Sequence, residues 1–200
     1  MYFKTNFEGN DYRPLFNIEV CNGKQIEALY DTGASIAVVN VSEEIFKKFD
    51  AKLQQKDASF KGFGGTVHGD LYTVSIVIGD LIFPELPVIK IEKTNINTSF
   101  IIPASMFGEF VVTLNNPEKT IEFKNNSNQV CYHMHIGDKV YTGEVMCAEY
   151  YSELRNRIIG ICGEENCNKV INLLPDITPV LDDVSLRAIV METLRNGKIK

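Results

Sequence analysis

The sequence predicts a mainly β protein, a barrel or sandwich of short strands followed by a smaller α+β appendage. As far as Phe123, polar and apolar residues alternate in short runs, with turn residues about every 8 to 12 positions, as is typical of all-β domains. From Glu149 onward, apolar residues recur at helical spacing instead. We therefore expect two regions, residues 1–124 and 125–200, in a chain of 200 residues that is 44% hydrophobic and long enough for a real core.

A hairpin opens the β region. Leu15 to Val20 alternates as a strand does, and Lys24 to Tyr30 has the pattern of the returning strand. Asn22-Gly23 between them is the strongest short signal for a two-residue type I′ turn. Further on, Ser42 is placed to cap a short helix, and Lys52 to Ala58 is interpreted as a polar connection.

Two more strands are expected in the middle of the β region. Leu71 to Ile78 alternates regularly, and Gly79-Asp80 predicts the turn that follows it. Pro84 and Pro87 predict a break, after which Val88 to Ile91 forms the next strand.

The β region is expected to end with a helical turn and a second hairpin. Thr98 to Ile102 is an apolar run, and Pro103 suits the first position of a short helix from Ala104 to Gly108. Phe110 to Leu114 and Thr120 to Phe123 then flank a turn rich in Asn and Pro, which indicates a hairpin.

The appendage combines a hairpin with helices. Val130 to Ile136 and Lys139 to Val145 lie on either side of a Gly137-Asp138 turn, after an Asn-rich linker. Helical spacing then predicts three helices, which cover Glu149 to Ile159, Glu164 to Leu174 and Asp183 to Arg195.

One carboxylate stands out because an apolar strand delivers it directly into a tight turn. Asp31 follows Ala28 to Tyr30, and Gly33 can adopt backbone angles that other residues cannot adopt without strain. A carboxylate at the end of a buried strand is costly unless donors surround it, and the Thr32 hydroxyl and nearby amides are the candidates. The alternative is an ordinary Asx-type turn between two strands.

A second informative stretch places three glycines among the four positions 62–65. A glycine-rich hairpin tip is mobile, because glycine restrains the backbone least, so this loop is a candidate lid. A phosphate-binding loop is a rival interpretation, but the stretch lacks a Gly-Lys-Ser/Thr ending and a dinucleotide fingerprint. A hairpin tip without function is the third.

Composition narrows the classes of partner and compartment. The net charge is −6 and the Lys and Arg residues are spread along the chain, which argues against a nucleic-acid surface. No stretch of about 18 apolar residues occurs and the first ten residues lack a leader pattern, so we expect a soluble, cytoplasmic protein with no membrane partner. Five cysteines, an odd number, favour reduced thiols over a disulfide framework.

The segment from about Tyr12 to Phe123 resembles the retropepsin-like aspartic proteases, the single-lobe relatives of pepsin. Three motifs carry the resemblance in the family's order and spacing. These are Asp31-Thr32-Gly33-Ala34-Ser35, the glycine-rich flap from Gly62 to Thr66, and Phe100-Ile101-Ile102 leading into a helix. One departure is Pro103, which stands where the family usually has glycine.

The resemblance implies a closed barrel of the acid protease fold, and an aspartic endopeptidase that needs no cofactor or metal. Each chain has one Asp-Thr/Ser-Gly triplet, so a homodimer would bring two Asp31 carboxylates together over a peptide or protein substrate. Asp31, Thr32 and Gly33 would be the catalytic residues. The residues implied in substrate binding are Ala34, Ser35, Gly62, Phe63, Gly64, Gly65 and Thr66.

Two further interpretations stay open at this point. The first is a retropepsin-shaped module that binds peptides or dimerises without turnover, which Pro103 and the long appendage favour. The second concerns Cys131, His133, His135 and Cys147, since alternate thiol and imidazole groups on one strand suit zinc. Scattered buried cysteines and surface histidines explain the same pattern without a metal.

Overall fold

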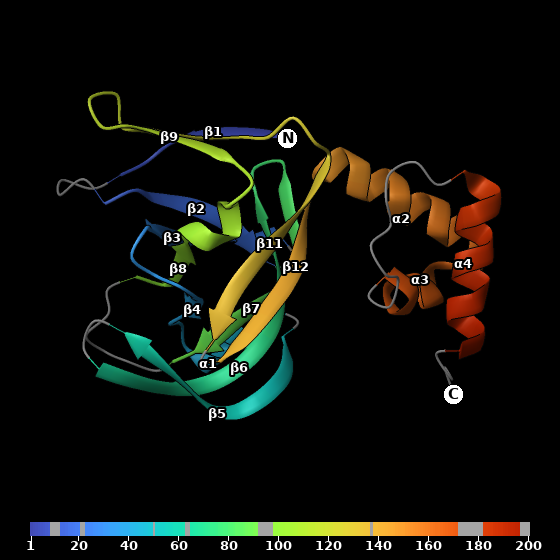
Figure 1. Cartoon of the computed structure of the whole chain (residues 1–200), viewed down its shortest axis with the longest axis horizontal. Coiled ribbons are helices and arrows are strands. Elements are labelled where there is room, and N and C mark those ends of the chain that lie inside the picture. Colours follow the sequence, from blue (N-terminus) through green and yellow to red (C-terminus); the bar gives the residue numbers. More distant parts are fainter. Residues whose placement is uncertain are drawn as a thin grey trace.

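The computed structural model describes residues 1–8, 13–20, 23–49, 51–62, 65–91, 98–136, 138–171 and 182–196. It shows a β-rich body with three helices extending to one side of it (Figure 1). The expectation of a mainly β protein with helices near its C-terminus is confirmed.

Six strands close into a barrel. Around the ring, strand β7 is followed by β4, β8, β3, β2 and β6, and β6 pairs again with β7. Two of the pairings, β3 with β8 and β4 with β7, are parallel, and the other four are antiparallel. The strands are β2 (Leu15–Val20), β3 (Lys24–Asp31), β4 (Ala37–Val39), β6 (Gly65–Ile78), β7 (Leu81–Lys90) and β8 (Phe100–Pro103).

Three groups of strands are added to this ring. Strand β5 (Lys52–Gly62) extends the sheet beyond β6, and the hairpin of β11 (Gln129–Ile136) and β12 (Lys139–Cys147) extends it beyond β7. A separate three-stranded sheet has the order β1, β10, β9, and contains β1 (Tyr2–Asn6), β9 (Val111–Asn115) and β10 (Thr120–Lys124).

Aromatic rings fill the space between the small sheet and the barrel. Phe123 of β10 stacks on Phe3 of β1 with ring centroids 6.1 Å apart, and it meets the edge of Tyr30 of β3 at 5.6 Å. Tyr132 and Met134 of β11 belong to the same buried cluster. The hairpin after the predicted boundary at residue 124 therefore packs on the barrel, although the boundary itself falls in the loop between β10 and β11.

The helices form a second, smaller core of their own. They are α2 (Ala148–Cys162), α3 (Glu164–Ile171) and α4 (Asp183–Asn196). Leu154, Ile158, Cys167, Val170, Leu186 and Val190 are buried among them. The predicted continuation of the second helix to Leu174 lies outside the described residues.

Two expectations about the strands were wrong. Residues 52–58, expected to be a connection, form the first part of β5, where most side chains are exposed and hide the strand pattern. The break predicted at Pro84 and Pro87 is absent, because β7 runs through both prolines and the β6–β7 register shifts between Val74 and Ile76. Such an irregularity lets a sheet accept a residue without an N–H group.

Gly79 and Gly23 have the positive φ expected of turn glycines, whereas Gly33 in the turn after Asp31 does not, so the special backbone angle expected at Gly33 is absent. Gly79 has a φ of 57° between β6 and β7, and Gly23 has a φ of 73° between β2 and β3. The other predicted turn residues, Asn22 and Gly137, lie outside the described residues.

A buried lysine fixes the short helix α1 (Glu43–Phe46) on the barrel. Ser42 caps this helix by accepting a hydrogen bond from the Ile45 amide, as predicted. The Lys90 side chain at the end of β7 is only 7% exposed, forms an ion pair with Glu43, and places its ammonium 4.8 Å from the centre of the Phe46 ring.

Removing the carboxylate of this pair is expected to destabilise the fold. In Glu43→Ala the buried Lys90 ammonium loses this ion-pair partner, which destabilises the folded state. The loss is limited because Glu43 is 62% exposed, so solvent already screens the pair. We expect the free energy of unfolding in urea to fall by about 1 kcal/mol. The control is Glu44→Ala, another acid of the first helical turn, and an equal loss in both variants would contradict a specific role for the pair.

Candidate active site

Asp31 is the last residue of β3, at the point where the strand leaves the barrel wall. Ala28 and Tyr30 before it are buried, whereas Asp31 is half-buried and Thr32 and Gly33 are exposed. β3 runs parallel to β8, and Asp31 is paired with Pro103. Because Pro103 is the last residue of β8 and precedes the 3₁₀ turn Ala104–Phe107, the missing N–H group ends the ladder rather than interrupting it.

The turn after Asp31 holds one oxygen of the carboxylate. The Gly33 amide donates to Asp31 Oδ1 at 2.8 Å, and the Ala34 amide donates to the Asp31 carbonyl at 3.3 Å. The predicted role as a donor to the carboxylate is confirmed for the Gly33 amide and wrong for the Ala34 amide, which donates to the main chain instead. The Thr32 hydroxyl, the other candidate, makes no hydrogen bond within the described part of the chain. A Cβ atom at Gly33 would lie 3.3 Å from the same carboxylate oxygen, so a side chain there would crowd it.

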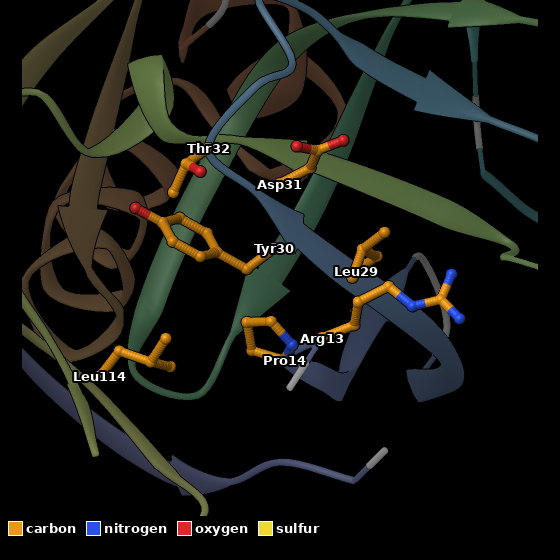
Figure 2. A pocket seen from close by; sticks show the side chains of 7 residues that line it. All are labelled: Arg13, Pro14, Leu29, Tyr30, Asp31, Thr32 and Leu114. Carbon is orange, nitrogen blue, oxygen red and sulfur yellow. The ribbon is translucent and has the colours of Figure 1, made fainter. Parts of the chain in front are cut away.

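A hollow of about 300 Å³ lies beside the turn. Figure 2 shows Asp31 and Thr32 at one end of it, with Leu29, Pro14 and Leu114 among the apolar side chains around it. Arg13 and Tyr30 complete its lining. The hollow therefore combines one carboxylate with mostly apolar walls.

Sequence reasoning missed part of this lining. Arg13, Pro14 and Leu114 were not singled out, and Leu114 reaches the hollow from β9, far along the chain. The available signal was its position opposite Ile121 in the β9–β10 pair, which puts Leu114 on the inner face of that sheet, although it remains 42% exposed.

The glycine-rich stretch is the end of the β5–β6 hairpin. Gly62 is paired with Gly65 and Thr66 with Lys61, while Phe63 and Gly64 lie outside the described residues. β6 is paired with β7 only from Asp70 onward, so the part of the hairpin beyond it projects from the barrel wall as a two-stranded arm.

An apolar cluster links this arm to the Asp31 turn. Ile36, which follows Ser35, is buried with Val38 of β4 and Ala58 of β5, and Phe60 of the arm packs against the same cluster. The described residues of the arm do not line the hollow that holds Asp31. Ala34 is half-buried and Ser35 exposed in the turn. The predicted site residues thus form two groups, the turn and the arm, joined through apolar side chains.

Comparison with known families decides the assignment of this region. Residues 10–104 match the family model of the retroviral aspartyl protease, a span that includes β2, the Asp31 turn, the arm and β8. Residues 10–104 belong to the retropepsin-like family. The resemblance seen in the three motifs is therefore confirmed.

Solved structures similar to this retropepsin-like chain include two bacterial proteins. A retropepsin-like aspartic protease from Rickettsia conorii is 15% identical, with 72% of this chain and 95% of that chain covered and a TM-score of 0.44. A Legionella pneumophila protein of unknown function is 11% identical, with 44% and 79% covered and a TM-score of 0.31. No curated protein matches the chain.

The structure does not assemble the alternative zinc site. Cys131 and His133 lie on one face of β11, where His133 Nδ1 is 3.1 Å from the Thr142 hydroxyl, whereas strand alternation turns Cys147 to the opposite face of β12. Among the described residues, no three His, Cys, Asp or Glu side chains come close enough to hold a metal ion. The described helices likewise include none long and apolar enough to cross a membrane.

Proposed function

We propose that this retropepsin-like chain is an aspartic endopeptidase that acts as a homodimer and hydrolyses peptide bonds with water activated between two Asp31 carboxylates. The observation that carries the proposal is the oriented carboxylate of Asp31, held by the Gly33 amide at 2.8 Å, in a residue that helps to line an accessible hollow. The sequence has a single Asp-Thr/Ser-Gly triplet, so one chain supplies one of the two carboxylates. The second would come from another copy.

The chemistry requires the two carboxylates to be in different protonation states. Two carboxylates that share a site cannot both ionise, and the aspartic-protease dyad is the standard example of this coupling. The ionised member would deprotonate the water that attacks the peptide carbonyl, and the protonated member would donate to the developing oxyanion. Both titrations belong to the pair rather than to one residue, so activity is expected to have a bell-shaped dependence on pH.

The surrounding residues would position the turn and the substrate. We assign Thr32 to contacts that hold the two turns together, and Ala34 and Ser35 to contacts with the substrate backbone. The arm would close as a flap over an extended peptide and pair with its main chain through Gly62, Phe63, Gly64, Gly65 and Thr66, which would exclude water during the reaction. Support for this assignment comes from the apolar cluster that ties Phe60 to Ile36.

We also propose a reducing compartment such as the cytoplasm. Support for this comes from the sequence, whose five cysteines are an odd number and so favour reduced thiols over a disulfide framework. The interpretation as an inactive module loses one of its arguments, because Pro103 ends β8 without disturbing the pairing with Asp31.

Cleavage of a peptide mixture at several protein concentrations tests the proposal. We expect cleavage of internal peptide bonds between acidic and neutral pH, inhibition by a statine-type compound, and a specific activity that rises with protein concentration as chains associate. Cleavage whose rate per chain stays constant at concentrations where sedimentation shows only monomer would refute the shared dyad.

A further inference from the structure

The β5–β6 hairpin, a long curved pair of strands in Figure 1, contains a β-bulge where its arm leaves the barrel. Between the pair Gln55–Leu71 and the pair Ala58–Gly69, β5 has two residues and β6 has only one. One of the two, Asp57, has a φ of 48°, a left-handed conformation that is uncommon for residues other than glycine. A bulge bends its strand and increases the local twist, so it can redirect the part of a hairpin that lies beyond it.

Two polar contacts hold the bulge. The Asp57 amide donates to Asp70 Oδ1 at 3.0 Å, so a side chain of β6 accepts the bond from a backbone donor of the bulge. The Asp57 carboxylate lies 3.1 Å from His68 Nδ1, but these two side chains are 82% and 59% exposed, so solvent screens that contact. Asp70 is half-buried, which makes its bond to the Asp57 amide the more specific support of the bulge.

The strand β7 ends at the same level. The β6–β7 pairing begins at Asp70, opposite Lys90, which is the last residue of β7. A Cβ atom at Gly69 would collide with the Lys90 carbonyl oxygen and would lie 2.7 Å from Ile89 Cγ2, so β6 crosses the end of β7 without room for a side chain. The arm therefore starts at a fixed crossing point, and the bulge in β5 sets the direction in which it leaves.

This direction decides whether the arm reaches the segment after the Asp31 turn. Ala58, the first residue of β5 beyond the bulge, is buried in one cluster with Ile36, and Phe60 packs against the same cluster. A bend of different size at the bulge would move Ala58 and Phe60 away from Ile36. The bulge and the apolar cluster are therefore two supports of a single arm conformation.

We propose that Asp57 and Asp70 are positioning residues, whose hydrogen bond fixes the bulge and thereby directs the arm toward the Asp31 turn. The inference rests on the arm acting as the flap of the proposed function. Without this bond the arm would adopt other directions more often, and the substrate would bind a smaller population of chains. The apparent affinity for substrate then falls by the same factor, whereas the chemical step is unchanged once the arm has closed.

Asp70→Ala tests this role because it removes the acceptor of the Asp57 amide. We expect KM for a cleaved peptide to rise about fivefold at nearly constant kcat, the ratio that corresponds to one net hydrogen bond. Amide hydrogen exchange over residues 58–69 should accelerate by a similar factor, while exchange in β2 and β3 stays as in the wild type. Asp70→Asn keeps an oxygen that can accept from the Asp57 amide, so both values should stay near those of the wild type.

Gln54→Ala is the matched control. A second register shift of β5 lies between Leu53 and Gln55, and Gln54 Nε2 donates to Thr73 Oγ1 at 3.1 Å beside it. There Thr73 of β6 is also paired with Pro87 of β7, so this shift lies in the barrel wall and not at the start of the arm. We therefore expect KM and the exchange of the arm to be unchanged.

The other outcomes separate this inference from the proposed function. Unchanged KM and unchanged exchange in Asp70→Ala would overturn the inference, and so would an equal change in Gln54→Ala. A lower kcat at constant KM would also contradict it, because Asp70 would then act in the chemical step. In each of these cases a wild type that cleaves peptide leaves the endopeptidase standing. If the wild type cleaves nothing but the exchange of the arm responds as expected, the bond still directs the arm and the proposed endopeptidase fails.

Discussion

Asp31→Asn is expected to abolish detectable peptide cleavage, with a loss of kcat/KM of about 10⁴-fold. The side-chain oxygen of the substituted amide can still accept the hydrogen bond that the Gly33 amide gives at 2.8 Å, so the turn should keep its shape. An amide cannot take a proton from water or donate one as a carboxylic acid does, so the general acid–base step is lost. Initial rates on a cleaved peptide, with circular dichroism to verify folding, measure the effect.

Mixing the variant with the wild type tests whether the two carboxylates come from two chains. After subunits exchange freely at equal amounts, about one quarter of the dimers contain two wild-type chains, so activity should fall to about one quarter of that of wild type at the same total concentration. A fall to one half would mean that each chain works alone. Asp138→Asn, a change at an exposed acid of the β11–β12 turn, is the control and should leave the activity unaltered.

The sequence allowed most of the barrel to be predicted because its strands bury one face and expose the other. β2, β3 and β6 show this alternation directly. β1 pairs with β10 at the far end of the β region, where Phe3 lies opposite Phe123. It was missed because no residue near Tyr2–Asn6 in the sequence indicates so distant a partner. The first part of β5, residues 52–57, was missed because its side chains are exposed on both faces.

The candidate site was predictable only where one short stretch contains the chemistry. The Asp31 turn could be recognised because the strand, the carboxylate and Gly33 are consecutive. Leu114 could not, since it reaches the hollow only after the small sheet packs on the barrel. Tyr30 was interpreted as an apolar strand residue, but its packing on Phe107 and Phe123 could not be predicted, because both rings are distant in the chain.

Phe123→Ala is expected to cause the largest loss of stability, about 3–5 kcal/mol in the free energy of unfolding. The ring is fully buried and lies between the small sheet and the barrel. Its ring contacts are Phe3 at 6.1 Å, Phe16 at 6.1 Å, Tyr30 at 5.6 Å and Phe107 at 4.2 Å. Deleting it would open a cavity that these rings cannot fill without moving, and urea or thermal denaturation would measure the cost.

Two comparisons establish whether this ring supports the site as well as the fold. Val111→Ala, on exposed β9 where the side chain is 68% exposed, should change the unfolding free energy by less than about 0.5 kcal/mol. Phe123→Leu retains much of the volume and should lose less stability than Phe123→Ala. The Tyr30 ring contacts the Phe123 ring, and Tyr30 directly precedes Asp31. At a temperature where all three variants are folded, we therefore expect Phe123→Ala to lose the most activity. Unfolding losses that are equal in Phe123→Ala and Val111→Ala would mean that the aromatic cluster does not hold the small sheet to the barrel.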